Sequence, residues 1–333
     1  MKPAFLKGLK LGNLRLREAL DRDLLRVEAL VRDSLRADEP FIAGLTETVL
    51  APPGKRLRPI LVLLAAGRPG ASSQAAVLAA AVVEMIHTAT LLHDDVVDAS
   101  LHRRGQPTLN ALSGDGAAIL MGDFVYSRAI TLLVEAELTQ VLGLLATTVH
   151  RMSVGELMQL DLRDRRLLSE EAYRRVIYEK TARLIEACCA SGAILGGAAA
   201  GVAAAYSDFG RNIGMAFQIV DDVLDYEADP AVLGKPVGSD LAEGKQTLPL
   251  LLAHAAAPPA GRARLEALLA AQDGDAARQE IVELVRSLGG TVAALAAARR
   301  YGEAARAALA GLPAGEIREA LDATVDYVVE RER

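Results

Sequence analysis

An acidic pentapeptide occurs twice in this otherwise apolar, helix-forming chain, and it is the feature that most constrains the fold. It reads Asp-Asp-Val-Val-Asp at residues 94–98 and Asp-Asp-Val-Leu-Asp at residues 221–225. In a helix, the first and last Asp of each copy lie one turn apart on one face, where like charges repel by about 0.2 to 0.5 kcal/mol. Both copies follow apolar residues, and carboxylates at the edge of a core are usually paired or bound to metal. The fold must therefore bring both copies to a site that compensates their charge.

The composition indicates an all-α protein. Of its 333 residues 51% are hydrophobic, only 4% are aromatic and none is Trp, and Ala and Leu favour helices over strands. The predicted helices span residues 14–37, 41–50, 59–66, 73–98, 116–135, 138–164, 169–191 and 209–228, with further helices after a break at 258–261. Loops are expected at 99–107 and 229–247. Without a Gly/Ser linker, we expect a single domain over residues 1–333, in which residues 1–40 form an N-terminal helical arm.

Charge and cysteine content exclude several classes of protein. The net charge of −6 is spread without a basic face, so nucleic acid is not expected as a partner. The only two cysteines, Cys188 and Cys189, are adjacent and cannot cross-link distant segments, which favours a reducing compartment. With no apolar leader at its start, the chain is expected to be cytoplasmic. Residues 187–207 lack charge and are long enough to span a membrane, but their Gly and Ala favour a buried helix, so we expect no spanning segment.

Polar and basic residues accompany both acidic motifs. His87 precedes Asp94 by two helical turns, and Gln218 lies three residues before Asp221. Basic groups follow in order along the chain: Lys55, Arg56, Arg58, Arg103, Arg104, Lys180 (next to Thr181), Lys235 and Lys245. Arg presents a fork that matches phosphate oxygens, and Lys presents a point charge. For a single motif, a solvated acidic face is the commoner explanation. Two motifs accompanied by these polar and basic residues indicate a diphosphate bound through Mg²⁺. This ion is typically held by one or two carboxylates and substrate phosphates.

The order of these motifs over residues 54–249 resembles the trans-isoprenyl diphosphate synthases of the polyprenyl synthetase family. The resemblance rests on Gly-Lys-Arg-Leu-Arg-Pro, His-Thr-Ala-Thr-Leu-Leu-His-Asp-Asp-Val-Val-Asp, Arg-Arg-Gly-Gln-Pro-Thr, Gly122-Asp123, Lys180-Thr181-Ala182, Phe-Gln-Ile-Val-Asp-Asp, Gly234-Lys235 and Gly244-Lys245. It implies an isoprenoid synthase type helical bundle around a central cavity, usually a homodimer. Its substrates would be isopentenyl diphosphate and an allylic prenyl diphosphate. The lipid product could associate the protein peripherally with a membrane.

The resemblance also assigns roles to individual residues. About three Mg²⁺ ions would be held by Asp94, Asp95, Asp98, Asp221, Asp222 and Asp225. Isopentenyl diphosphate would contact Lys55, Arg56, Arg58, His87 and Arg104. The allylic diphosphate would contact Arg103, Lys180, Thr181, Gln218, Lys235 and Lys245. The catalytic core would be Asp94, Asp98, Lys180 and Asp221. His93, His102, His150 and His254 lack the spacing of a transition-metal site and are expected to be structural or exposed.

Product length is predicted from the residues before the first acidic motif. In this family the fourth and fifth residues before that motif form the cavity floor, and here they are Thr90 and Ala89. A small residue at Ala89 lets a growing chain pass to the next turn, about 5.4 Å further along the helix, where Met85, Ile86 and Val82 would form the wall. This favours a product of C30 or longer, as in octaprenyl and heptaprenyl diphosphate synthases. Ala89 is also compatible with simple helix packing.

Other functions stay open at this point. The alternatives within the family are a shorter-chain farnesyl or geranylgeranyl diphosphate synthase and the large subunit of a heteromeric prenyl synthase. A terpene cyclase or a head-to-head prenyl synthase would also need Asp-rich helices, but the basic cluster at residues 55–58 favours chain elongation. A non-catalytic subunit is expected to have lost one acidic motif, and both are intact here.

Overall fold

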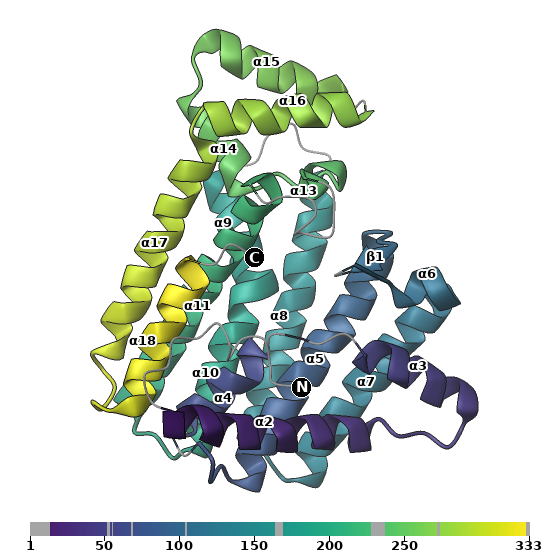
Figure 1. The fold of residues 1–333 in the computed structure, drawn as a ribbon, viewed down its shortest axis with the longest axis vertical. Coiled ribbons are helices and arrows are strands. Elements are labelled where there is room, and N and C mark those ends of the chain that lie inside the picture. The colour runs from purple at the N-terminus through teal and green to yellow at the C-terminus, as the bar shows by residue number, and fades with distance from the viewer. Residues whose placement is uncertain are drawn as a thin grey trace.

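The computed structural model describes residues 14–330 except 52–53, 55, 68, 104, 164–168, 228–236 and 272–273. The described residues are almost entirely helical, which confirms the all-α class (Figure 1). The helices are α2 (Leu14–Ser34), α3 (Pro40–Leu50), α4 (Leu57–Ala65), α5 (Gln74–Val97), α6 (Leu109–Ser113), α7 (Asp115–Glu135), α8 (Thr139–Arg163), α9 (Glu170–Ile177), η1 (Tyr178–Ala182), α10 (Arg183–Leu195), α11 (Ala200–Glu227), α13 (Ser239–Ala242), α14 (Leu248–Ala256), α15 (Pro259–Ala271), α16 (Gly274–Ser287), α17 (Gly290–Leu309) and α18 (Glu316–Val329). Within the predicted loop 99–107, β1 (His102–Arg103) and β2 (Gln106–Pro107) form a small antiparallel hairpin.

Helix α5 is the central helix of one half of the bundle. Ser73 caps its start, where the side-chain oxygen accepts a hydrogen bond from the Ala76 amide at 3.1 Å. Residues 76–86 are buried on every side, which is the pattern of a helix surrounded by protein. It packs against α2, α4, α7 and α10, and its last turn carries the first acidic motif.

Helix α11 has the same place in the other half, between α10 and α17. It begins at Ala200, nine residues before the predicted start, and the second acidic motif lies near its C-terminal end. Gly210 and Gly214 allow close packing, because a Cβ atom at either position would lie within 3 Å of the backbone of α10 or η1. The two acidic motifs therefore occupy the final turns of two long core helices.

The predicted helix 169–191 is divided into α9, the π-helix η1 and α10. The apolar stretch 187–207 is not one helix either, because it turns at Gly196 and Gly197 between α10 and α11. In the described part of the chain, α5 and α7 are long and apolar enough to cross a membrane by length and composition, and α16 with α17 would be a third as a bent pair. The apolar window of α5 is 72% buried inside the fold, and that of α7 is 39% buried.

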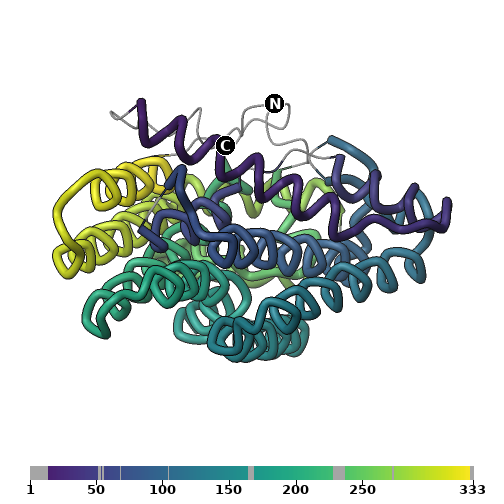
Figure 2. Tube along the Cα trace, turned by 90° about the horizontal axis from the view of Figure 1, so that it is seen from below, coloured from purple at the N-terminus to yellow at the C-terminus, as the bar shows by residue number. Residues whose placement is uncertain are grey.

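In the described part of the N-terminal arm, helix α2 lies across the bundle (Figures 1 and 2). Helix α2 packs on α4 and α5 through apolar side chains such as Leu20 and Leu24. The buried carboxylate of Asp23 accepts hydrogen bonds from the Gly70 amide and the Ser72 hydroxyl, each at 2.6 Å. Helix α2 is therefore part of the core.

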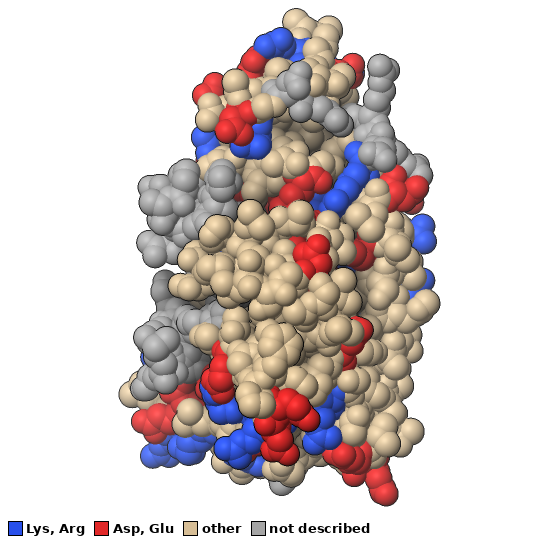
Figure 3. Space-filling view, turned by 90° about the vertical axis from the view of Figure 1, so that its right-hand side faces the viewer, with Lys and Arg blue, Asp and Glu red and all other residues tan. Residues whose placement is uncertain are grey.

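A broad uncharged surface occupies the side of the molecule on which α7 lies (Figure 3). The exposed apolar side chains of α6 and α7 include Leu112, Ile119, Leu120 and Val134. Leu120 alone is 68% exposed. Exposed apolar surface of this kind is typical of an interface with another protein or a membrane.

Candidate functional site

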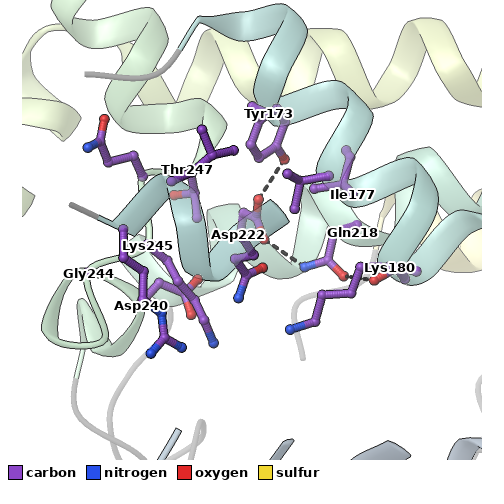
Figure 4. Close-up of a pocket in the computed structure, with 15 residues that line it drawn as sticks. Tyr173, Ile177, Lys180, Gln218, Asp222, Asp240, Gly244, Lys245 and Thr247 are labelled. Carbon is purple, nitrogen blue, oxygen red and sulfur yellow. Dashed lines mark hydrogen bonds between the residues drawn. The ribbon is translucent and has the colours of Figure 1, made fainter. Parts of the chain in front are cut away.

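A polar cavity of about 120 Å³ lies where α8, α9, η1, α11 and the segment 240–247 meet (Figure 4). Its charged and polar lining includes Lys180 and Thr181 from η1, and Gln218 and Asp222 from α11. Arg163, Asp240 and Lys245 line it as well. The cavity thus gathers cations and carboxylates from segments far apart in the sequence.

The first acidic motif is neutralised by cations of the protein itself. Arg103 on β1 donates its Nε hydrogen to Asp95 Oδ1 at 2.9 Å. Asp98 accepts from Lys245 Nζ at 2.8 Å and also from Arg163 on α8. Burial alone would raise the pKa of Asp98, but Lys245 and the neighbouring cations outweigh it and hold that pKa below its usual value.

Asp94 lies in a different environment. Burial raises the pKa of this carboxyl to about 6; the charge of Lys180 acts against the rise, while Glu156 and Asp98 add to it. The ionised form is therefore disfavoured at this position. A bound cation would restore it, so Asp94 is the carboxyl in this motif with the most to gain from a metal.

The second acidic motif is largely built into the fold. Asp222 is buried and accepts hydrogen bonds from Tyr173 Oη at 2.6 Å and from Gln218 Nε2 at 2.8 Å (Figure 4). Burial and the charge of Asp240 raise the pKa of Asp222 well above its usual value. Asp225 is 1% exposed and accepts from Ser239 Oγ at 2.5 Å and from the Asp240 amide at 3.1 Å. Asp221, by contrast, is only partly buried.

The carboxylates of the two motifs suit a hard divalent cation. In the described ranges no three Asp, Glu, His or Cys side chains lie close enough to form a complete metal centre. Mg²⁺ typically takes one or two carboxylates and completes its shell with water and substrate phosphates. Asp94 and Asp221, one from each motif, offer such oxygen donors.

The π-helix η1 positions Lys180 and Thr181. Thr181 Oγ1 donates to Gln218 Oε1 at 2.8 Å, and Lys180 Nζ pairs with Glu156 Oε2 on α8 at 2.5 Å. Single π-helical turns occur often at functional sites. Gly155 on α8 and Gly214 on α11 enclose the turn, since a Cβ atom at Gly155 would lie 2.8 Å from the Lys180 nitrogen and one at Gly214 would lie 2.6 Å from Ala182 Cα.

Several site residues were missed by the sequence reading. Glu156, Gln159 and Arg163 lie at i, i+3 and i+7 on α8 and face Lys180, the cavity and Asp98, respectively. That spacing marks one face of a helix and was available as a signal. Tyr173 and Asp240 have no such signal, because their contacts with the second motif depend on the tertiary fold.

Of the predicted isopentenyl diphosphate residues that the structure describes, Arg56 and Arg58 lie at the start of α4 and His87 lies on α5. Arg58 and His87 are partly buried, on α4 and α5. Arg56 makes ion pairs with Glu84 at 2.5 Å and Glu28 at 3.4 Å. Lys55, Arg104 and Lys235 lie outside the described residues.

The residues expected to set product length face the protein interior. Ala89 is 2% exposed, and Thr90 is partly buried with its hydroxyl bonded to the His87 carbonyl at 2.8 Å. One to two turns earlier on α5, Val82, Met85 and Ile86 are fully buried.

The histidines lie as expected for structural or exposed residues. His93 Nε2 is 3.2 Å from the Ile119 carbonyl, and a Cβ atom at Gly122 would collide with its ring, so this glycine lets α7 approach α5. His254 pairs with Glu266, while His102 and His150 are exposed.

Comparison with known proteins adds independent evidence. The model of the family described as polyprenyl synthetase matches residues 39–287. An octaprenyl diphosphate synthase of Escherichia coli is 39% identical over 96% of this chain and 99% of its own length. A polyprenyl synthase of Caulobacter crescentus, solved with calcium and isoprenyl diphosphate, has a TM-score of 0.91 and 39% identity over 97% of this chain and 99% of its own. A decaprenyl diphosphate synthase of Rhodobacter capsulatus has a TM-score of 0.88 and 40% identity over 96% of this chain and 99% of its own.

Proposed function

The chain belongs to the polyprenyl synthetase family, and we propose that it condenses isopentenyl diphosphate with an allylic diphosphate in successive 1′–4 additions. The product would be an all-trans polyprenyl diphosphate of C30 or longer. One observation supports this most strongly: Lys245, which follows the second acidic motif, bonds Asp98 of the first motif. Both motifs and the cavity that holds Lys180 and Gln218 thus form one site.

We assign the allylic diphosphate to the cations near this cavity, Lys180, Arg103 and Lys245, together with Thr181 and Gln218. Asp94 and Asp221 would provide the principal metal ligands, and Asp95, Asp98, Asp222 and Asp225 would support them. About three Mg²⁺ ions, when bound, would neutralise the negative charge of the leaving diphosphate. The calcium in the Caulobacter crescentus structure supports divalent metal binding by this family.

The chain's own residues would guide the remaining chemistry. Breaking the C–O bond of the allylic substrate leaves a carbocation, which the double bond of isopentenyl diphosphate attacks. A proton then leaves to the departing diphosphate, and the allylic product is five carbons longer. Backbone and hydroxyl dipoles at Lys180 and Thr181 would stabilise the cation. The surrounding helices would exclude water, which would otherwise capture it.

We also propose that the protein acts as a homodimer through α7. Leu112 on α6 and Ile119, Leu120 and Val134 on α7 are exposed, and the side of the molecule on which α7 lies carries a broad uncharged surface (Figure 3). An interface of this composition is typical of a permanent dimer, because such interfaces resemble a core cut in half.

The proposed function is tested by replacing one carboxylate in each motif. Asp94→Ala and Asp221→Ala should each lower condensation of isopentenyl diphosphate with farnesyl diphosphate by at least about a thousandfold, since each removes a metal ligand. Helical content by circular dichroism should not change. Asp208→Ala is the matched control on α11, because Asp208 is exposed and pairs only with nearby Arg211 among the contacts described.

Full activity in both Ala variants would refute the assignment of the site. If the purified wild-type protein is inactive and a second polypeptide restores its activity, the protein is a subunit of a heteromeric synthase and not a homodimer.

A further inference from the structure

Arg56, at the start of α4, has an unusual backbone conformation. Its φ of 58° and ψ of 28° lie in the left-handed region, which residues other than Gly adopt uncommonly. It is the residue directly before the helix, and its carbonyl accepts from the Ile60 amide at 3.2 Å. The surrounding structure must therefore hold the segment 54–58 in place.

The side chain of Arg56 supplies that restraint. Its Nη1 donates to Glu84 Oε1 at 2.5 Å, and its Nε donates to Glu28 Oε1 at 3.4 Å. Glu84 is only 8% exposed within the otherwise apolar part of α5, where a carboxylate is costly unless it is paired. The ion pairs therefore join α2, the segment before α4, and α5.

Gly54 packs closely against the ion pair between Arg56 and Glu84. A Cβ atom at Gly54 would lie 3.1 Å from Arg56 Nη1 and 3.3 Å from Glu84 Oε1. The backbone of the segment thus passes directly over the buried pair. Glu84 is also one turn before His87 on α5. The pair consequently fixes the start of α4, which carries Arg58, relative to the helix that carries His87.

We propose that Arg56 is a positioning residue rather than a ligand of isopentenyl diphosphate. Through Glu84 it aligns the start of α4 with α5, so that Arg58 and His87 can bind one diphosphate. Through Glu28 it also ties the N-terminal helix α2 to this position. This inference rests on the proposed function, since it names how one of the two substrate sites is built.

Steady-state kinetics of Arg56→Gln and Glu84→Gln test the inference. Each should raise KM for isopentenyl diphosphate by about tenfold or more, because a displaced segment misplaces the diphosphate groups, while KM for the allylic primer stays within about twofold. The double variant should be no worse than the more severe single variant by more than about twofold, because both changes break one contact. Arg56→Lys should recover part of the loss, since Lys keeps the charge but lacks the fork.

Arg32→Gln is the matched control. Arg32 pairs with Glu47 at 2.9 Å across α2 and α3, and both side chains are exposed, so this variant should keep both KM values. Equal effects of Arg56→Gln on the two substrates, or none on either, would overturn the inference. If Arg56→Gln does not fold, Glu28→Gln leaves the buried pair intact and should still raise KM for isopentenyl diphosphate relative to Glu47→Gln; no difference would overturn the inference.

Calorimetric titration with isopentenyl diphosphate separates the inference from the proposed function. Wild-type protein that binds this ligand but forms no product would refute the proposed function alone, and the inference would then stand or fall on a tenfold weaker binding by Arg56→Gln. Wild-type protein that does not bind isopentenyl diphosphate would refute both.

Discussion

The acidic side chains of the two motifs differ in how much of their charge the protein compensates. Asp98 bonds Lys245 and Arg163, and Asp222 and Asp225 each accept two hydrogen bonds from side chains or backbone. Asp94 is compensated less, since burial raises its pKa in spite of the charge of Lys180. The two nearly identical pentapeptides therefore place their carboxyl groups in different environments.

At Ala89, the volume of one side chain should set product length. Replacing Ala89 with Val, Leu and Phe should shorten the product stepwise, because the growing chain is proposed to extend past Ala89 toward Met85 and Ile86 and a larger side chain would block it. Ala89 is buried, and overpacking costs about 1 to 3 kcal/mol, so thermal melting must show that each variant is folded. Chromatography of the products gives the result. An unchanged spectrum across the series would remove Ala89 from the account.

Among the elements, the π-helix η1 carries Lys180 and Thr181, and its packing against neighbouring helices positions these side chains. It lies between Gly155 and Gly214, and neither position has room for a Cβ atom. Gly155→Ala should push η1 outward and lower kcat on the order of 10- to 100-fold, since small displacements of positioned groups are costly. Gly143→Ala on the same helix is the control, because its Cβ would meet nothing within 4 Å. Equal kcat values in the two variants would contradict the role of η1.

The elements also show what the sequence predicted well. The expected helices 73–98 and 116–135 match α5 and α7 to within a residue at each end, because caps and apolar spacing are local signals. The division of the predicted helix 169–191 was missed, since η1 depends on glycines of α8 and α11 that pack on either side.

For the site, the sequence predicted residues but not their long-range contacts. The sequence predicted Thr181, Gln218 and Asp222 as site residues, and in the structure hydrogen bonds join Thr181 to Gln218 and Gln218 to Asp222. The contacts of Tyr173 with Asp222 and of Arg56 with Glu84 were not foreseen, because long-range pairing leaves no local pattern.

At the scale of the whole molecule, α7 bounds the fold and supplies the proposed dimer interface. The mass of the purified protein by light scattering should be twice the 35.2 kDa of one chain. Leu120→Glu should lower it toward one chain, because a charge at the centre of an apolar interface is unpaired. Val292→Glu on α17 is the control, since Val292 is 70% exposed and Leu120 is 68% exposed. A wild-type monomer would refute the dimer.

We propose that the two acidic motifs and the small side chain of Ala89 on α5 together serve repeated chain elongation. Purified protein with farnesyl diphosphate, radiolabelled isopentenyl diphosphate and Mg²⁺, followed by chromatography of the products, tests this claim most directly. The account predicts prenyl diphosphates of C30 or longer, formed only when the divalent metal is present. Products that stop at C20 would contradict it.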